Sequence, residues 1–295
     1  MTTPASSSDL ELTVASSGLA LAKSIYDRRG IVVVRGLLDA DVVGHALETL
    51  RKLLAARAAA VGIDGLADAS AHELINALQA RDRRYVMDVI RIGKDLPEFY
   101  GTFTHPGLLK FAKTLVGSDI LQCVHDIAQI RIDPPDDAVR NFDWHQDFHY
   151  NLTSENAVTA WFPLSPIDRD MGQLVVAPGS HRALAKVQLD RRTHVPGQGT
   201  THATVKFQVD QPALEARAIE LDIVEPGDVA FFDCKLLHRS GLNRSDRSRI
   251  VFNPRYGNAL DPAVVGRGWS CMRDKTQDLL EALYPELLEA PSPKA

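Results

Sequence analysis

Two histidines and an aspartate are the residues of this chain whose types and spacing best support chemistry. His145 and Asp147 lie two apart in the segment 144–150, and His238 follows far downstream. If this segment is an extended strand, His145 and Asp147 project to one side while Gln146 points away. Two histidines and one carboxylate occupy one face of an octahedral Fe(II), as in oxygen-activating non-haem iron enzymes. These residues therefore predict an iron centre.

The spacing of the three residues leaves a second interpretation open. A His-x-Asp pair also suits a surface strand with two polar residues, and His145 and His238 meet only if the fold brings them together. The context of His238 favours a site, because residues 225–232 form a turn and an apolar strand shortly before it.

An arginine is the next candidate, since Arg249 lies on the expected strand 249–253 shortly after His238. A buried arginine needs a partner, and its guanidinium fork fits a carboxylate bidentately. That carboxylate belongs either to a ligand or to an internal Asp or Glu, and Arg244 or Arg247 is an alternative anchor.

The elements that must position these residues change character near residue 120. Before it, we expect a helical pattern over 10–29, a buried strand over 30–38 and a helix from Asp39 or Asp41 to about 61. Further helices are expected over 71–82 and 106–116. After residue 120 the segments are short, strand-like and separated by Pro, Gly and Asp, namely 128–132, 144–150, 157–163, 173–177, 205–209, 219–224, 228–233 and 249–253. This pattern predicts a double-sheet barrel or jelly roll.

The length of 295 residues suits one domain that is mainly β with α decoration. We expect a disordered tail over 1–9 and a catalytic domain over 10–289. Within it, a helical part spans about 10–119, a β core about 120–257 and a closing helix about 276–284. Residues 290–295 form a second tail.

The composition narrows the function classes. The net charge of −5 and the lack of a basic run argue against a nucleic-acid partner. Three widely spaced cysteines indicate neither a disulfide framework nor a thiolate zinc site. The start of the chain has no signal-peptide pattern, and no apolar run is long enough to span a membrane, so we expect a cytoplasmic protein. Hydrolase and dinucleotide-binding motifs are also missing.

Five motifs in order resemble the phytanoyl-CoA dioxygenase family of iron(II)- and 2-oxoglutarate-dependent oxygenases. They are Trp144-His145-Gln146-Asp147, residues 171–181 (MGQLVVAPGSH), Pro226-Gly227-Asp228, His238-x-Ser240-Gly241-x-Asn243, and Arg249. Any one motif is weak evidence, but five in order are specific. Residues 30–38 look like the first strand of that family, and the resemblance runs from about 20 to 257.

The resemblance implies a double-stranded β-helix fold, cupin-like, with iron on His145, Asp147 and His238. It also implies that Arg249 holds the distal carboxylate of 2-oxoglutarate, with Ser240 beside it. Gln129 and Trp161 stand where that family contacts the cosubstrate. Such enzymes use O2, convert 2-oxoglutarate to succinate and CO2, and oxidise an unactivated C–H bond. Related halogenases have a small residue in place of the carboxylate, so Asp147 implies hydroxylation or a related oxidation.

The substrate is a small molecule whose identity the residues leave open between a natural-product intermediate, an amino-acid derivative and an acyl thioester. Candidate substrate contacts are Phe142, Phe148 and His149, with Tyr150 and Trp269 as further lining residues. His149 would share a face with His145 and Asp147, either touching substrate or hydrogen-bonded at the barrel rim. His181 belongs to a turn motif, and we interpret it as structural. Residues 191–202 resemble a lid.

Two rival classes remain, and the oligomeric state is open between monomer and homodimer. A cupin-type metal enzyme that does not use 2-oxoglutarate would give Arg249 no cosubstrate to bind. A non-catalytic jelly-roll binding protein would retain the three residues without binding iron.

Overall fold

An eight-stranded sheet forms the centre of the computed structural model, which describes residues 6–13, 18–123, 129–136, 143–189, 205–269 and 276–289. The strand order is β1-β2-β10-β5-β12-β4, and β13 pairs with both β5 and β3. Its strands are β1 (Glu11–Thr13), β2 (Ile31–Arg35), β3 (Leu121–Cys123), β4 (Ile130–Asp133), β5 (Val158–Pro163), β10 (Val229–Asp233), β12 (Arg249–Phe252) and β13 (Arg255–Asn258). Strands distant in sequence are therefore hydrogen-bonded neighbours.

A smaller sheet of three strands lies opposite the inner face of the large one, since side chains from both pack in one apolar cluster. Its order is β11-β6-β9, with β11 (His238–Ser240), β6 (Leu174–Val176) and β9 (Ile219–Glu220). A single bridge between His145 and His238 extends it at the β11 edge. A separate hairpin is formed by β7 (Val187–Leu189) and β8 (Val205–Phe207). Two facing sheets agree with the predicted double-sheet barrel.

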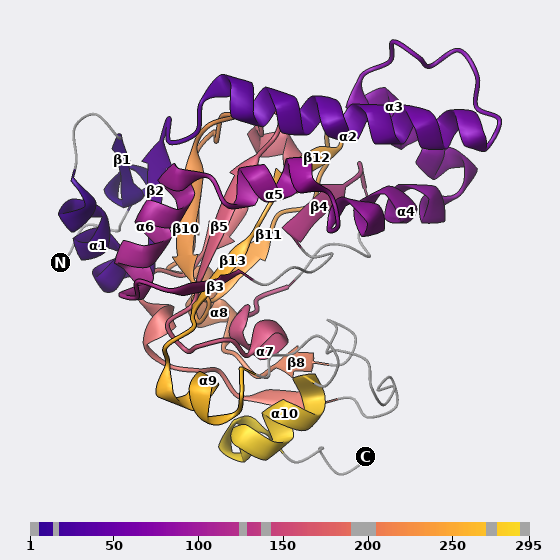
Figure 1. The fold of residues 1–295 in the computed structure, drawn as a ribbon. Helices are drawn as coiled ribbons and strands as arrows, with labels where there is room; N and C mark the ends of the chain where they lie inside the picture. Colours follow the sequence, from indigo (N-terminus) through magenta and orange to yellow (C-terminus); the bar gives the residue numbers. More distant parts are fainter. Residues whose placement is uncertain are drawn as a thin grey trace.

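Helices cover the outer face of the large sheet, and Figure 1 shows α2, α3, α4 and α5 lying across it. They are α1 (Leu19–Arg29), α2 (Ala40–Ala60), α3 (Ala71–Arg81), α4 (Arg83–Gly93), α5 (Pro97–Phe103) and α6 (Pro106–Val116). Because strand side chains alternate, β5 presents Ala160 and Phe162 to these helices, and β12 presents Ile250 and Phe252. These residues and the helices share one hydrophobic cluster.

The alternate residues of the same strands face the smaller sheet. Trp161 of β5 and Val251 of β12 pack with Leu174 and Val176 of β6. By the same alternation Arg249 lies on this inner face, and its register partner Asp133 on β4 lies there too. The large sheet therefore carries both apolar and charged side chains into the barrel interior.

Short helices close the lower end of the barrel in Figure 1. They are α7 (Phe148–Asn151), α8 (Gln211–Glu215), α9 (Pro262–Gly266) and α10 (Thr276–Leu283), and 3-10 turns occur at Ser7–Leu10, Arg169–Met171, Ser180–Arg182 and Pro285–Leu287. Phe148 packs against Tyr284 and Leu280 in a cluster with β7 and β8. None of the described helices is long and apolar enough to cross a membrane.

Most elements expected from the sequence are present, and the differences have physical reasons. Residues 10–29 are not one helix, because Glu11–Thr13 pairs with β2 as a strand and α1 begins only at Leu19. Ordered structure also begins before residue 10, since Leu10 is fully buried at the end of a 3-10 turn. The strand expected over 144–150 is wrong: His145 forms only an isolated bridge with His238, Asp147 already has helical backbone angles, and α7 follows. The helices α4 and α5 were not predicted.

Candidate metal centre

The structure brings His145, Asp147 and His238 together, each of them buried. One ligand atom from each residue lies within 4.8 Å of the others. The Oδ1 atom of Asp147 is 3.9 Å from Nε2 of His145 and 4.0 Å from Nε2 of His238. Ligand atoms this close, without a direct hydrogen bond between them, suit a metal ion held by all three.

Backbone hydrogen bonds fix both histidine rings. The backbones of His145 and His238 exchange two N–H···O bonds of 3.0 Å, which places the two residues opposite each other. His145 Nδ1 is 2.8 Å from the carbonyl of Asp143, and His238 Nδ1 is 2.9 Å from that of Leu236. A carbonyl only accepts, so each Nδ1 carries the proton and each Nε2 keeps its lone pair for a metal. Both rings are therefore oriented as ligands before any metal binds.

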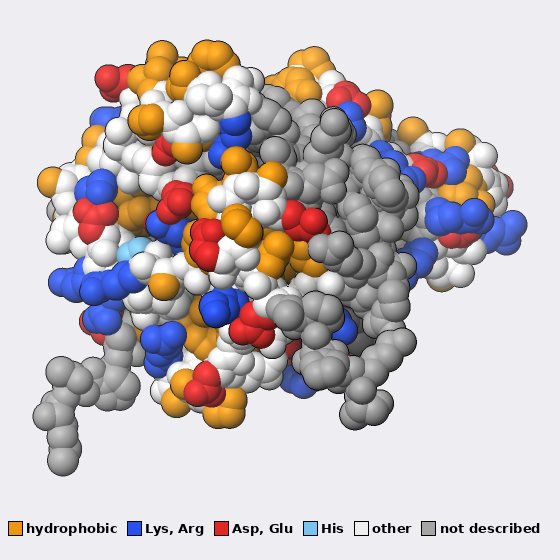
Figure 2. Space-filling view, turned by 90° about the horizontal axis from the view of Figure 1, so that it is seen from below, with side chains coloured by type: hydrophobic (Ala, Val, Ile, Leu, Met, Phe, Trp, Pro, Cys, Tyr) orange, Lys and Arg blue, Asp and Glu red, His pale blue; other side chains and the backbone are white. Residues whose placement is uncertain are grey.

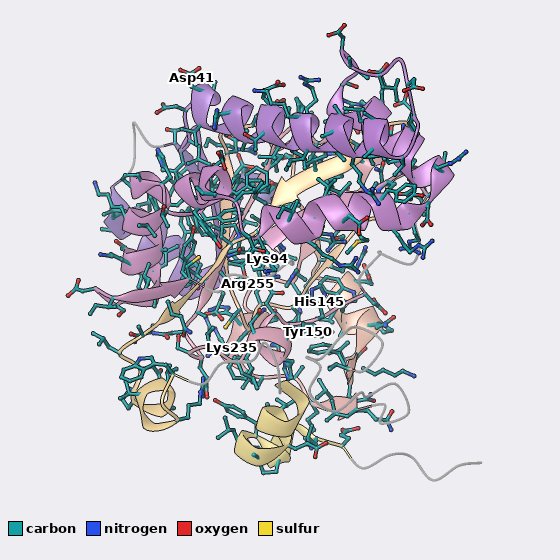
Figure 3. All side chains as sticks on the ribbon, turned by 45° about the vertical axis from the view of Figure 1, so that its right-hand side comes forward. Asp41, Lys94, His145, Tyr150, Lys235 and Arg255 are labelled. Atoms are coloured by element: carbon teal, nitrogen blue, oxygen red, sulfur yellow. The ribbon has the colours of Figure 1, made fainter. Side chains whose placement is uncertain are left out.

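Asp147 is held by the large sheet. Its Oδ2 accepts from Thr159 Oγ1 at 2.7 Å and from Arg255 Nε at 2.9 Å, and Oδ1 accepts from Arg255 Nη2 at 3.2 Å. Thr159 and Arg255 are register partners on β5 and β13, so they reach the carboxylate from adjacent positions. Figure 3 labels Arg255 and His145 in one region below the helices. The carboxylate thus bridges the two sheets with Oδ1 turned toward the histidines.

The charges around the centre favour the ligand forms of these side chains. Burial alone would raise the pKa of Asp147, but the positive charge of Arg255, together with His238, outweighs it and holds the pKa well below its ordinary value. Burial lowers the pKa of His238, although Asp147 acts in the opposite direction. An ionised carboxylate and neutral imidazoles are the forms that bind divalent metals.

A helix outside the centre connects the two histidine segments. Glu215 at the end of α8 accepts from Trp144 Nε1 at 2.8 Å and from Arg239 Nε and Nη2 at 3.1 and 3.0 Å. Trp144 precedes His145 in the chain, and Arg239 follows His238. Glu215 therefore supports the spacing of the two histidines from their far side.

Arg249, expected to hold a cosubstrate carboxylate, is buried and paired with a carboxylate of the protein. Its Nε and Nη2 donate to Asp133 Oδ2 at 3.1 and 2.8 Å. Its Nη1 donates to the carbonyls of Met171 at 3.2 Å and Gly241 at 3.5 Å. The internal partner considered from the sequence is therefore present. Arg247 forms a half-exposed pair with Asp168 instead.

The remaining cosubstrate candidates lie in the barrel interior. Ser240 is buried on β11, two residues from His238, so both side chains project to the same face. Gln129 is fully buried directly before β4, and its Nε2 donates to Cys123 Sγ at 3.6 Å. Trp161 packs in the apolar cluster between the sheets. Their contact with a cosubstrate stays a prediction.

The candidate substrate contacts have different surroundings. The expectation that His149 shares a face with His145 and Asp147 rested on a strand, and α7 removes its premise; His149 Nε2 donates to the carbonyl of Ala185 at 2.9 Å. Phe148 is buried against α10. Phe142 and the expected lid, residues 191–202, lie outside the described residues.

Two further residues are placed by the structure. Trp269 is 53% exposed and donates from Nε1 to the carbonyl of Ala259, so it lies on the surface. His181, interpreted as structural, donates from Nε2 to the carbonyl of Asp27 at 3.2 Å and lies against Gly30. Gly30 has φ +81°, and an added Cβ would lie 2.5 Å from the His181 ring, so the contact requires glycine there.

Aromatic rings border the centre on the side of the β7–β8 hairpin. The ring centroid of Tyr150 lies 5.9 Å from that of His145, and the ring centroid of Phe207 on β8 lies 6.5 Å from it. Phe207 also contacts His149, with ring centroids 4.8 Å apart. Figure 3 labels Tyr150 beside His145. Phe207 was not predicted from the sequence, because only the pairing of β7 with β8 brings it beside the rings of His145 and His149.

Comparison with known proteins gives a consistent result at the sequence level. A family model described as Phytanoyl-CoA dioxygenase (PhyH) matches residues 26–251. A Streptomyces arenae protein named 1-deoxypentalenic acid 11-beta-hydroxylase is 30% identical over 259 residues, which cover 84% of this chain and 82% of that protein. The peroxisomal phytanoyl-CoA dioxygenase of Bos taurus is 25% identical over 242 residues, which cover 80% of this chain and 68% of that protein.

Solved structures share the fold. The epimerase SnoN in complex with Fe3+, alpha ketoglutarate and nogalamycin RO matches with a TM-score of 0.53 at 19% identity, covering 94% of this chain and 91% of that chain. EctD from S. alaskensis with bound Fe matches with a TM-score of 0.52 at 20% identity, covering 81% and 76%. The fold class expected from the sequence, mainly β with α decoration, is confirmed.

Proposed function

The chain belongs to the phytanoyl-CoA dioxygenase family of iron(II)- and 2-oxoglutarate-dependent oxygenases, and on this premise we propose that it hydroxylates an unactivated C–H bond of a small organic molecule. The observation that carries the proposal is the buried group of His145, Asp147 and His238. We assign these three residues as the iron ligands, within a single catalytic domain.

The residues fit Fe(II) by their chemistry. Two Nε2 lone pairs and one carboxylate oxygen meet, and Arg255 and Thr159 hold the carboxylate from behind. Bound Fe(II) would let O2 act as the oxidant: as 2-oxoglutarate loses CO2, one oxygen atom of O2 would enter succinate and the other would remain to oxidise the substrate. The role of the protein is to hold three ligand atoms on one side, which leaves the other side of the metal for small molecules.

We assign Arg249 and Ser240 to the distal carboxylate of 2-oxoglutarate. Arg249 donates to the carbonyl of Gly241, which is three residues beyond His238 in the chain. At the rise of a strand, three residues place this carbonyl, and the guanidinium beside it, roughly 10 Å from His238. The apolar residues Trp161 and Val251 on the same inner face keep water from the interior.

The substrate meets the metal beside aromatic rings in this proposal. Tyr150 and Phe207 contact the His145 ring and offer apolar surface to a hydrocarbon part of the substrate. The name of the Streptomyces arenae relative, 1-deoxypentalenic acid 11-beta-hydroxylase, gives a small organic acid as its substrate. This name supports a natural-product intermediate as the substrate of the present chain.

The wider setting stays part of the proposal. We propose a cytoplasmic enzyme that acts as a monomer or homodimer on a small molecule, with neither nucleic acid nor a membrane as partner. On the described part of the face shown in Figure 2, acidic, basic and hydrophobic side chains are interspersed. The named relatives from mammals are peroxisomal, so fractionation of the native host tests the compartment.

The experiment that tests the function is an anaerobic titration. Fe(II) and then 2-oxoglutarate are added to metal-free protein, and the weak visible charge-transfer band of the chelated complex is recorded. We expect the band in wild type and its loss in His238→Ala. His181→Ala, which removes a buried histidine outside the centre, is the matched control and keeps the band.

Other outcomes separate the rival classes. If iron binds without a band, the cosubstrate assignment is wrong and a cupin-type metal enzyme is indicated. If wild type binds no iron, the chain is a binding protein in which the three residues have no catalytic role.

Replacing Arg249 is expected to weaken 2-oxoglutarate binding. Arg249→Ala removes a charge-assisted contact, so the 2-oxoglutarate concentration for half-maximal turnover rises by roughly 10- to 100-fold. Steady-state kinetics measure the effect, and thermal unfolding reports the loss of the Arg249–Asp133 pair separately. Arg247→Ala is the control, because Arg247 pairs with Asp168 at a half-exposed position. An unchanged requirement in Arg249→Ala would show that another group binds the cosubstrate.

A further inference from the structure

The contact between Arg249 and Asp133 has a consequence for cosubstrate binding. Arg249 is 3% exposed, and each of its three nitrogen atoms donates to an acceptor of the protein. The edge formed by Nε and Nη2, which suits bidentate binding of a carboxylate, is directed at Asp133 Oδ2. A cosubstrate carboxylate therefore meets an arginine whose fork is already engaged.

Asp133 has a second cationic partner besides Arg249. Arg131 Nε donates to both of its oxygens, at 2.9 Å and 2.7 Å. Burial would raise the pKa of Asp133, but the charges of Arg131 and Arg249 outweigh it and keep the pKa below its ordinary value. The pair with Arg131 lets the carboxylate lose Arg249 without becoming a buried charge that has no cation beside it.

The register of the sheet holds the two residues opposite each other. Asp133 and Arg249 are paired positions on the antiparallel strands β4 and β12, so their side chains leave the same face. The register of β4 and β12 therefore places the two side chains next to each other on the inner face.

We propose that Asp133 is an internal competitor of the cosubstrate, which lowers the affinity for 2-oxoglutarate by occupying the Arg249 fork. This inference rests on the proposed function, in which Arg249 binds the distal carboxylate. Two carboxylates cannot share one bidentate edge, and a second negative charge beside the first repels it. Binding of 2-oxoglutarate exchanges one carboxylate for another at Arg249 while Arg131 retains Asp133.

The test compares two 2-oxo acids that differ only in the distal carboxylate. Fe(II)-loaded protein without oxygen is titrated with 2-oxoglutarate or with 2-oxopentanoate, which has the same chain length. In Asp133→Asn, which keeps the shape and an acceptor oxygen, we expect the Kd for 2-oxoglutarate to fall by roughly tenfold. The Kd for 2-oxopentanoate is expected to stay unchanged, because that acid has no distal carboxylate that could bind Arg249.

Two further variants test whether the effect comes from the charge of Asp133. Asp133→Ser removes the same charge with a smaller side chain and gives the same direction of change, should the asparagine variant not fold. Asp228→Asn removes the carboxylate of another ion pair, with Arg35 at 2.7 Å, and is expected to leave both Kd values unchanged.

The outcomes separate this inference from the function on which it rests. A Kd for 2-oxoglutarate that is unchanged or higher in Asp133→Asn overturns the inference alone, as does an equal change for both acids. Equal binding of 2-oxoglutarate to wild type and Arg249→Ala overturns the assignment of Arg249, and the inference with it.

Discussion

Asp147→Ala is expected to abolish turnover and to lower Fe(II) affinity by several orders of magnitude. Under the proposed assignment, the substitution removes the one negatively charged iron ligand and leaves two neutral imidazoles. It also takes away the carboxylate that accepts from Arg255 and Thr159. Breaking a buried ion pair costs about 3–5 kcal/mol of stability, so the variant also unfolds at a lower temperature. Anaerobic Fe(II) binding and thermal unfolding measure the two effects.

Asp147→Asn separates the role in metal binding from the role in stability. An amide keeps the shape and one acceptor oxygen for Arg255, so we expect a smaller loss of stability than in the alanine variant. Fe(II) binding and turnover still fall, because the amide oxygen carries no charge. Full turnover by either purified variant without added ligands would contradict the assignment of Asp147 as an iron ligand.

Arg255→Met is expected to weaken Fe(II) binding through the loss of the hydrogen bonds that Arg255 donates to Asp147. The guanidinium holds both oxygens of Asp147, which turns Oδ1 toward His145 and His238. Losing a partner that orients a metal ligand typically costs 10- to 100-fold in metal affinity or activity, and we expect about this loss. The measurement is Fe(II) titration of the metal-free protein, followed by turnover at saturating iron.

The control for Arg255 separates charge from orientation. Arg255→Lys keeps the positive charge but lacks the planar fork, so its Fe(II) affinity is expected to lie between those of wild type and the methionine variant. A merely structural role would lower the thermal stability of Arg255→Met while leaving the Fe(II) affinity of the folded protein unchanged. That combination would refute the proposed role of Arg255 in orienting Asp147.

Local sequence patterns were sufficient to predict much of the fold. The β-branched segment of β2, the helix after Asp39 and the short strands of the core follow from side-chain periods that neighbouring residues determine. The same alternation identifies which residues of β5 and β12 face the helices. The segment after Asp147 is the exception, because a strand continued over 148–150 would lack the contacts that Phe148 makes with α10 in the helical turn.

The sequence by itself determined the residue types of the centre, the arginine at 249 and, through five ordered motifs, the family. Only the tertiary structure decided the partners of these residues. Arg255 reaches Asp147 because β13 pairs with β5, and Asp133 occupies Arg249 because β4 pairs with β12. Strand register between distant segments decides both contacts. No local period encodes such a register, since it depends on how the whole sheet pairs and on which buried charges must be balanced.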